Sequence, residues 1–275
     1  MYEAIFIDID GTLRDNNKNI SKRTKKAIKN IIEKGIYVIL SSGRPIKYTE
    51  KISKECDASK YIIASDGGII YNYEQNKIIY KNIISKEAII ELYKIAEQAD
   101  VRILMDAGEN RVVNKLKYLD GSETILNIDI ETFVEKNDVQ SCAISDTNFE
   151  KMEKLQEKIE KIKDIEIKQK LKSFGDIKGN KDEIMYFFIG NKESCKGNAI
   201  GKLCKILNID LKNTIAIGDD YNDISMFKVV GYSVVMENAN NEVKKYADEI
   251  TMSNERDGVA IFLENLLKKF DNNKI

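Results

Sequence analysis

The chain has 275 residues, which is enough for one large domain or two modest domains with a substantial hydrophobic core. Its 44 basic residues nearly balance its 45 acidic residues, so no overall positive field favours nucleic acid as a partner. The sequence contains no histidine. This absence excludes Ser-His-Asp hydrolysis, zinc sites built on histidine, and phosphohistidine chemistry.

The cysteines and the N-terminus indicate where the protein works. Cys56, Cys142, Cys195 and Cys204 form no C-x-x-C pair, which is typical of reduced thiols in the cytosol. No basic segment followed by an apolar stretch opens the chain, and no long apolar run follows later. We therefore expect a cytoplasmic protein with neither a membrane nor a nucleic acid as partner. The sequence gives no expectation for the oligomeric state.

The first eighty or so residues alternate strand signals with helix signals. Ser21 can cap a helix that stops at Gly35, Pro45 can open a second helix, and Asp66-Gly67-Gly68 precedes a hairpin. The predicted strands are Tyr2–Asp8, Tyr37–Leu40, Tyr61–Ala64 and the hairpin pair Ile69–Tyr71 and Ile78–Tyr80.

The middle of the chain, over residues 83–189, has a different rhythm of strands and helices. We predict a helix from Ser85 to about Ala99, weaker extended stretches up to Phe133, and a charged helix over Asn148–Lys163. Further extended segments are predicted at Val101–Met105, Ala143-Ile144, Ile165–Leu171 and Met185–Ile189. This mixture predicts an independent α+β unit inserted into the first domain.

The regular alternation returns over residues 190–275. The predicted strands are Thr214–Ile217, Tyr232–Met236 and an edge strand at Glu249–Thr251, and the predicted helices are Lys196–Leu207, Asp223–Val229, Asn241–Tyr246 and Gly258–Phe270. Together with residues 1–82, this pattern predicts an α/β fold with a doubly wound parallel sheet. Ligands are then expected at the carboxyl ends of the strands.

Asp8 and Asp10 follow the first predicted strand directly. Because strand residues alternate between faces, the two carboxylates lie on the same side of the strand end. Like charges held so close are costly without a cation, so the pair indicates a metal site. Taken alone, the segment could also be a turn with solvated carboxylates.

Two other predicted strands end in polar residues of the same kind. The first of these strands is followed by Ser41-Ser42-Gly43-Arg44, a segment that can offer free backbone N–H groups to an anion. The second is followed by residues 218–223, which hold three carboxylates and an amide that suit a hard cation. An ordinary turn that caps the next helix is the alternative for each. Lys196-Gly197 opens the helix before Thr214–Ile217, and alone it would be a solvated lysine.

Taken together and in order, these segments resemble the four motifs of the haloacid dehalogenase (HAD) superfamily. Asn238 and Asp257 lie in segments similar to the tail of its Cof-type sugar-phosphatase branch. Only a helix fits between Asp10 and Ser42, whereas about 150 residues separate Ser42 from Lys196. This spacing resembles the type with a C2 cap, and so implies a Rossmann-like HAD core over 1–82 and 190–275 with an α+β cap over 83–189.

The resemblance implies a phosphatase that hydrolyses a small phosphorylated metabolite, either a sugar phosphate or a phosphorylated cofactor, with Mg²⁺. It implies an aspartyl-phosphate on Asp8, with Asp10 as general acid and base and therefore with a raised pKa. Ser42 and Lys196 would bind and neutralise the phosphoryl group. The remaining implied roles are substrate binding by Gly43, Arg44 and Asn222, and magnesium binding by Asp8, the backbone carbonyl of Asp10, Asp219 and Asp223.

Three details remain open within this resemblance. Asn222 is expected to orient Asp219 or to touch phosphate, and Asp220 is expected to face solvent. The family often has asparagine where this chain has Asp66, and an ionised carboxylate cannot donate a hydrogen bond to phosphate. A phosphomutase on the same core and a non-catalytic phosphometabolite-binding protein are the alternative functions.

Overall fold

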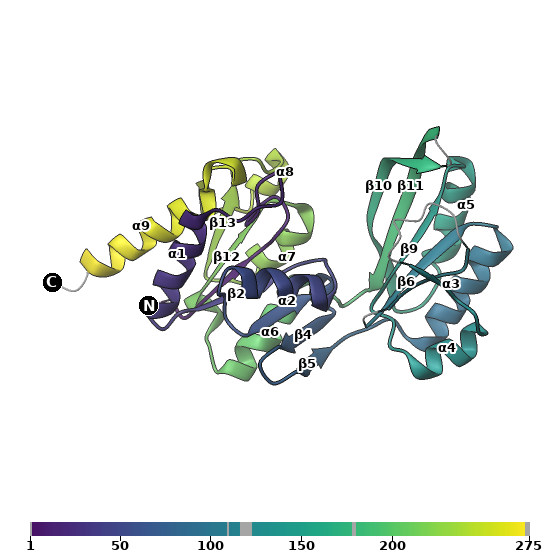
Figure 1. Ribbon diagram of the computed structural model, residues 1–275, viewed down its shortest axis with the longest axis horizontal. Helices are drawn as coiled ribbons and strands as arrows, with labels where there is room; N and C mark the ends of the chain where they lie inside the picture. Colours follow the sequence, from purple (N-terminus) through teal and green to yellow (C-terminus); the bar gives the residue numbers. More distant parts are fainter. Residues whose placement is uncertain (1, 109, 116–122, 178–179, 273–275) are drawn as a thin grey trace. The chain divides into compact units, whose positions relative to one another are not determined.

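The computed structural model describes residues 2–108, 110–115, 123–177 and 180–272, and it divides into two compact units (Figure 1). The first unit joins Met1–Lys81 to Cys195–Ile275, and the second is Asn82–Ser194. The sequence rhythm predicts the inserted unit over residues 83–189. None of the helices in the part of the chain that the structure describes could span a lipid bilayer.

The first unit is built on a mainly parallel sheet. Its strands are β1 (Ala4–Ile7), β2 (Tyr37–Ser41), β3 (Tyr61–Ala64), β4 (Ile69–Asn72), β5 (Lys77–Lys81), β12 (Thr214–Gly218), β13 (Tyr232–Met236) and β14 (Glu249–Thr251). They lie in the order β14-β13-β12-β1-β2-β3-β4-β5. All neighbours from β14 to β3 are parallel, and β4 and β5 form an antiparallel extension. The predicted doubly wound α/β fold is confirmed.

Helices cover both faces of this sheet (Figure 1). They are α1 (Lys22–Glu33), α2 (Ile46–Glu55), α6 (Lys196–Leu207), α7 (Ile224–Phe227), α8 (Asn241–Lys244) and α9 (Gly258–Asn272). One apolar cluster joins α1, α2 and α9 to the sheet, and another joins α6, α7 and α8 to its other face. Along β1, Ile5 and Ile7 belong to the first cluster while Ala4 and Phe6 belong to the second. β1 is therefore buried on both faces, as a central parallel strand must be.

Local sequence signals position the helices that flank the site. The Ser21 hydroxyl accepts a hydrogen bond from the backbone N–H of Thr24 at 3.0 Å and so caps α1. Pro45 precedes α2, and α6 begins at Lys196 as predicted. These boundaries place the start of each helix at the edge of the sheet where the parallel strands end.

The second unit pairs a sheet with helices on one face. Its strands are β6 (Arg102–Ala107), β7 (Asn110–Val113), β8 (Thr124–Ile125), β9 (Ser141–Asp146), β10 (Ile165–Ile177) and β11 (Asn180–Asn191). Its helices are α3 (Lys86–Gln98), α4 (Ile130–Lys136) and α5 (Phe149–Ile159). The strand order is β10-β11-β9-β6-β7-β8, and the three helices share one apolar cluster with the sheet.

The stretch leading to Phe133 corrects one prediction. The extended stretches predicted up to Phe133 give way at Ile130 to α4, because the Asp129 carboxylate accepts a hydrogen bond from the N–H of Thr132 at 2.7 Å and caps a helix. Ile130, Phe133 and Val134 are buried at helical spacing. Residues 116–122 of the same stretch lie outside the described residues.

Candidate active site

The predicted site residues of the first unit meet at the carboxyl ends of adjacent parallel strands. β1 lies between β12 and β2, and Ile7 pairs with both Ile217 and Leu40. Asp8, Asp219 and Ser42 follow these strand ends directly. The motifs that lie far apart in the sequence are therefore brought together by the topology of the sheet.

Lys196 is the buried cation of this site. Its side chain is 0% exposed, and its Nζ donates to Asp8 Oδ1 at 2.5 Å and to Asp223 Oδ1 at 2.7 Å. Burial by itself lowers the pKa of Lys196, but the charges of Asp223 and Asp8 outweigh burial and raise the pKa. Lys196 is therefore a protonated ammonium held between two carboxylates, and not the solvated lysine that the motif would suggest alone.

Three carboxylates surround this ammonium. Oxygens of Asp8, Asp219 and Asp223 lie within 4.8 Å of one another. Burial raises the pKa of Asp8 well above its usual range. Burial, together with the charge of Asp223, raises the pKa of Asp219 to about 6. One ammonium leaves about two negative charges uncompensated, and hard oxygen donors in this number suit a divalent cation such as Mg²⁺.

Hydrogen bonds fix the loop that follows β12. Asp223 Oδ2 accepts from the backbone N–H groups of Asp219 at 2.9 Å and Asp220 at 3.0 Å. Its other oxygen accepts from Lys196, so Asp223 orients both the loop and the lysine. The Asp220 side chain is exposed, as expected.

Thr12 and Asn238 orient Asp219, and sequence reasoning missed both roles. Thr12 Oγ1 donates to Asp219 Oδ1 at 2.6 Å. Asn238 Nδ2 lies 3.4 Å from Asp219 Oδ2 and donates to the carbonyl of Gly11 at 2.9 Å. The sequence position of Asn238 could have predicted this role. Asn238 comes just after β13, and the carboxyl end of β13 lies beside that of β12.

Position 11 must be glycine, because the carboxylate of Asp219 lies where a side chain at this position would be. The φ of Gly11 is +89°, and a Cβ at this position would lie 2.3 Å from Asp219 Oδ2. We expect Gly11→Ala to lower kcat/KM at least tenfold, because the carboxylate of Asp219 must move. Gly35→Ala is the matched control, since Gly35 has φ +82° with nothing within 4 Å of its Cβ position. A comparison of phosphate release by both variants checks this, and equal activity would contradict it.

Asp10 lies outside the cluster of three carboxylates. Its carboxylate is paired with Arg44 Nε at 2.9 Å and with Lys18 Nζ at 3.2 Å, and its side chain is 26% exposed. Partial burial raises the pKa of Asp10, but the hydrogen bonds and charges of Arg44 and Lys18 outweigh burial and lower the pKa. The expectation of a raised pKa for Asp10 is therefore wrong for this arrangement.

The loop that follows β2 places the predicted phosphate ligands. Ser42 is buried, and its hydroxyl accepts from the N–H of Arg44 at 3.1 Å. The Arg44 side chain is 54% exposed and forms an ion pair with Asp10. Gly43 is exposed beside these two residues.

The contacts of Asn222 exclude one of its two predicted roles, the orientation of Asp219. Asn222 Nδ2 donates to Asp66 Oδ1 at 2.8 Å. Asn222 therefore holds Asp66 and does not orient Asp219, a role that Thr12 and Asn238 fill. The reason is geometric, because Asn222 lies in the turn beyond Asp219 and faces the loop that follows β3.

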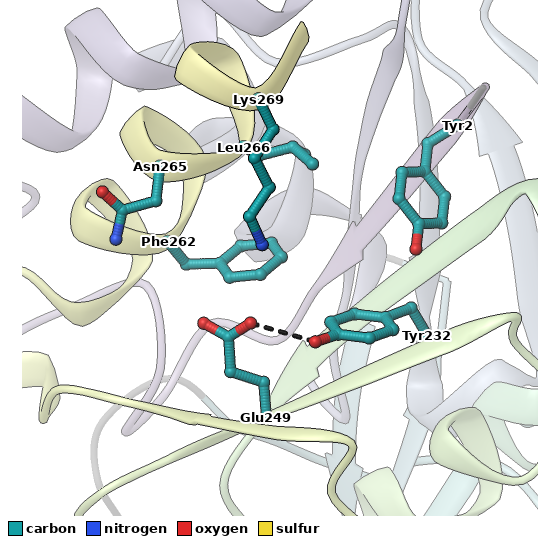
Figure 2. Close-up of a pocket in the computed structure, with 7 residues that line it drawn as sticks. All are labelled: Tyr2, Tyr232, Glu249, Phe262, Asn265, Leu266 and Lys269. Atoms are coloured by element: carbon teal, nitrogen blue, oxygen red, sulfur yellow. Dashed lines mark hydrogen bonds between the residues drawn. The ribbon is translucent and has the colours of Figure 1, made fainter. Parts of the chain in front are cut away.

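A separate pocket lies at the other end of the parallel strands of the same sheet. Figure 2 shows Tyr2, Tyr232 and Phe262 as its aromatic wall, beside the Glu249 carboxylate that accepts from the Tyr232 hydroxyl at 3.0 Å. Tyr232 and Glu249 are the first residues of β13 and β14. The pocket therefore opens where the strands begin, away from the carboxylates and Lys196, and it is not the predicted site.

Comparison with known proteins gives the family. The profile of the haloacid dehalogenase-like hydrolases matches residues 5–263. A Buchnera aphidicola (subsp. Schizaphis graminum) protein provisionally named a phosphatase is 32% identical over 100% of this chain and 98% of its own length. The 5-amino-6-(5-phospho-D-ribitylamino)uracil phosphatase YwtE of Bacillus subtilis is 28% identical over 96% of this chain and 98% of its own length.

A solved structure agrees over nearly the whole length. The crystal structure of a haloacid dehalogenase-like hydrolase from Bacteroides thetaiotaomicron matches with a TM-score of 0.75 and 27% identity. The match covers 97% of this chain and 100% of that protein. The chain therefore belongs to the haloacid dehalogenase-like hydrolases, in the Cof-type branch that its motifs indicated, and it is a phosphoric monoester hydrolase.

Proposed function

We propose that this enzyme uses Mg²⁺ to hydrolyse a sugar phosphate or a phosphorylated cofactor through an aspartyl-phosphate on Asp8. The observation that carries the proposal is the buried Lys196 ammonium, 2.5 Å from Asp8 Oδ1 and 2.7 Å from Asp223 Oδ1. Asp8 and Asp223 belong, with Asp219, to a cluster whose negative charge exceeds what one lysine neutralises. The ribitylaminouracil phosphate named for the relative YwtE falls within the proposed substrate class.

The carboxylates of this cluster offer the hard oxygen donors that a magnesium ion prefers. Asp8, Asp219 and Asp223 supply carboxylate oxygens, and the backbone carbonyl of Asp10 is the proposed fourth donor. Thr12 and Asn238 hold the Asp219 carboxylate in place. When bound, Mg²⁺ supplies positive charge that keeps Asp8 ionised and offsets the charge of the phosphoryl group.

Asp8 acts as the nucleophile in this proposal. One of its carboxylate oxygens forms a bond to phosphorus while the bond from phosphorus to the ester oxygen breaks. Lys196 neutralises charge shared by Asp8 and the phosphoryl oxygens, and the hydroxyl of Ser42 with the nearby N–H groups holds those oxygens. Asp10 gives its proton to the departing alkoxide and then takes a proton from the water that attacks phospho-Asp8, which releases phosphate and regenerates Asp8.

Arg44 and Lys18 link substrate binding to the protonation of Asp10. Both cations lower the pKa of Asp10 in this structure. If they turn toward an incoming phosphorylated substrate, the carboxyl of Asp10 loses these stabilising charges and its pKa rises toward the value that a general acid needs. Arg44, whose side chain is 54% exposed, is therefore assigned to substrate binding together with Gly43 and Asn222.

A substrate panel tests the proposed function. Phosphate release is measured from sugar phosphates, nucleotides and phosphorylated cofactors, each with Mg²⁺ and with EDTA. The proposal predicts turnover that requires Mg²⁺ and favours one of the two proposed classes. Turnover that is equal in EDTA would overturn the metal assignment. Transfer of phosphate from a sugar bisphosphate to a monophosphate, without net release, would instead show a phosphomutase.

Magnesium is also expected to stabilise the fold in a pH-dependent way. The pKa of Asp219 is raised to about 6 and that of Asp8 is also raised, so these two carboxyls bind more protons in the metal-free folded chain than in the unfolded chain. The contribution of these two carboxyls to stability without metal therefore falls as the pH rises from about 4 through about 6 and beyond. Mg²⁺ at about 100 times its Kd adds roughly 2.7 kcal/mol, and protons compete for the same carboxylates at low pH.

Thermal unfolding with Mg²⁺ and with EDTA measures this effect. We expect the rise in Tm on adding Mg²⁺ to be several degrees at about pH 7.5 and much smaller at about pH 5. Asp220→Asn serves as the control, because its exposed carboxylate lies outside the cluster, and it should respond to Mg²⁺ like the parent chain. The same increase at both pH values would show that the ion binds elsewhere.

A further inference from the structure

Asp66 is a carboxylate at the site edge that the proposed mechanism leaves unused. It follows β3 in a short 3-10 turn, with φ +49°, and its backbone N–H donates to the carbonyl of Ser42 at 3.1 Å. Asp and Asn tolerate this left-handed conformation better than most residues. The backbone of Asp66 is thereby tied to the loop that carries the predicted phosphate ligand.

The Asp66 carboxylate lies between two loops of the site. On one side, Oδ1 accepts from Asn222 Nδ2 at 2.8 Å, in the loop that follows β12. On the other side, a Cβ at position 43 would lie 3.0 Å from Oδ2, so the carboxylate lies against the bare backbone of Gly43. The Asp66 carboxylate is thereby held between the loop that follows β2 and the loop that follows β12.

The hydrogen bonding of Asp66 leaves one oxygen for a ligand. Among the described residues, Oδ2 accepts no hydrogen bond, and the side chain is only partly buried. An ionised carboxylate can accept but cannot donate, so it repels phosphoryl oxygens and attracts a hydroxyl. An amide at this position would carry no charge and would form a weaker bond to the same hydroxyl.

We propose that Asp66 is a specificity-determining residue that accepts a hydrogen bond from a substrate hydroxyl close to the phosphate ester. This inference rests on the proposed function and narrows its substrate class. Asp66 would favour polyol and sugar phosphates that carry such a hydroxyl. It would disfavour esters that lack this hydroxyl or that carry an anionic group in its place. Asn222 fixes the orientation of the carboxylate by occupying its other oxygen.

Two small esters test this selection directly. Glycerol 3-phosphate and 3-hydroxypropyl phosphate differ in the hydroxyl on the carbon next to the ester carbon. We expect the parent enzyme to favour glycerol 3-phosphate in kcat/KM by about tenfold or more, and Asp66→Asn to reduce this ratio by about tenfold. Asn suits the positive φ at this position, and thermal unfolding checks that the variant folds.

The ratio of the two substrates separates selection from a structural effect. A purely structural role would lower both rates together and would leave the ratio unchanged. Asp220→Asn, the same substitution on an exposed carboxylate in the loop after β12, should keep the parent ratio. An unchanged ratio in Asp66→Asn overturns the inference.

Acetyl phosphate, which has no hydroxyl, distinguishes failure of the inference from failure of the proposed function. If the parent enzyme hydrolyses acetyl phosphate but neither ester, or hydrolyses both esters equally, the Asp66 proposal is wrong and the phosphatase proposal stands. If the folded parent enzyme with Mg²⁺ hydrolyses none of the three compounds or the panel substrates, the proposed function fails and the inference fails with it.

Discussion

Asp8→Asn is expected to reduce the rate of phosphate release by a factor of about 10⁴ or more. The asparagine side chain has nearly the same shape but lacks the anionic oxygen that forms the bond to phosphorus. The fold should not suffer from the change, because the buried Lys196 ammonium keeps the Asp223 carboxylate as its charged partner at 2.7 Å. Burial raises the pKa of Asp8 well above its usual range, so the folded metal-free chain favours an uncharged group at this position.

The measurement combines steady-state phosphate release with thermal unfolding in EDTA. We expect Asp8→Asn to unfold at a temperature equal to or above that of the parent chain, while activity is lost. Asp220→Asn is the matched control and should remain active, since its carboxylate is exposed and outside the cluster. Retention of more than about a tenth of the activity in Asp8→Asn would reject Asp8 as the nucleophile.

Lys196→Met is expected to lower both activity and stability. The substitution leaves the carboxylates of Asp8 and Asp223 buried without the ammonium that lies 2.5 and 2.7 Å from them. Removing one partner of a buried ion pair costs about 3–5 kcal/mol of unfolding free energy. The loss should be largest at about pH 8 and should shrink toward about pH 5, because protonation removes the unpaired charges.

Chemical denaturation at the two pH values measures this change. Lys205→Met is the control, because Lys205 lies on the same helix, α6, but is exposed, and its loss should change stability by less than about 1 kcal/mol. If Lys196→Met were as stable as Lys205→Met at high pH, Lys196 would not be the cation that compensates the carboxylates. Addition of Mg²⁺ should restore part of the lost stability but not the activity.

The sequence predicts most elements of the first unit because its signals agree with one another. The helix Lys196–Leu207 and the strand Tyr232–Met236 have the predicted bounds. Strands that are buried on both faces have continuous apolar runs, and caps such as Ser21 mark where helices begin, so the type of each element is clear from the sequence. In the second unit, α4 was missed because it spans only Ile130–Lys136, and so short an apolar pattern also suits an extended segment.

The sequence predicts which site residues follow the strand ends, but it does not predict which partners their side chains contact in the loops. Asp8, Ser42 and Asp219 meet because parallel neighbouring strands end at one edge, which the order of elements implies. The partners of Asp10 and Asn222 depend on the directions of side chains in loops, where no periodicity applies. Arg44 therefore lowers the pKa of Asp10, against the expectation from its role, and Asn222 pairs with Asp66.

Trapping the covalent intermediate shows whether Asp8 forms a bond to phosphorus. The parent enzyme is mixed with Mg²⁺ and acetyl phosphate that carries a radiolabelled phosphoryl group, quenched in acid within milliseconds, and digested into peptides. We expect label on the peptide that contains Asp8, formed before phosphate is released and absent from Asp8→Asn. Release of labelled phosphate with no label on the protein at any time, or label on another peptide, would contradict this expectation.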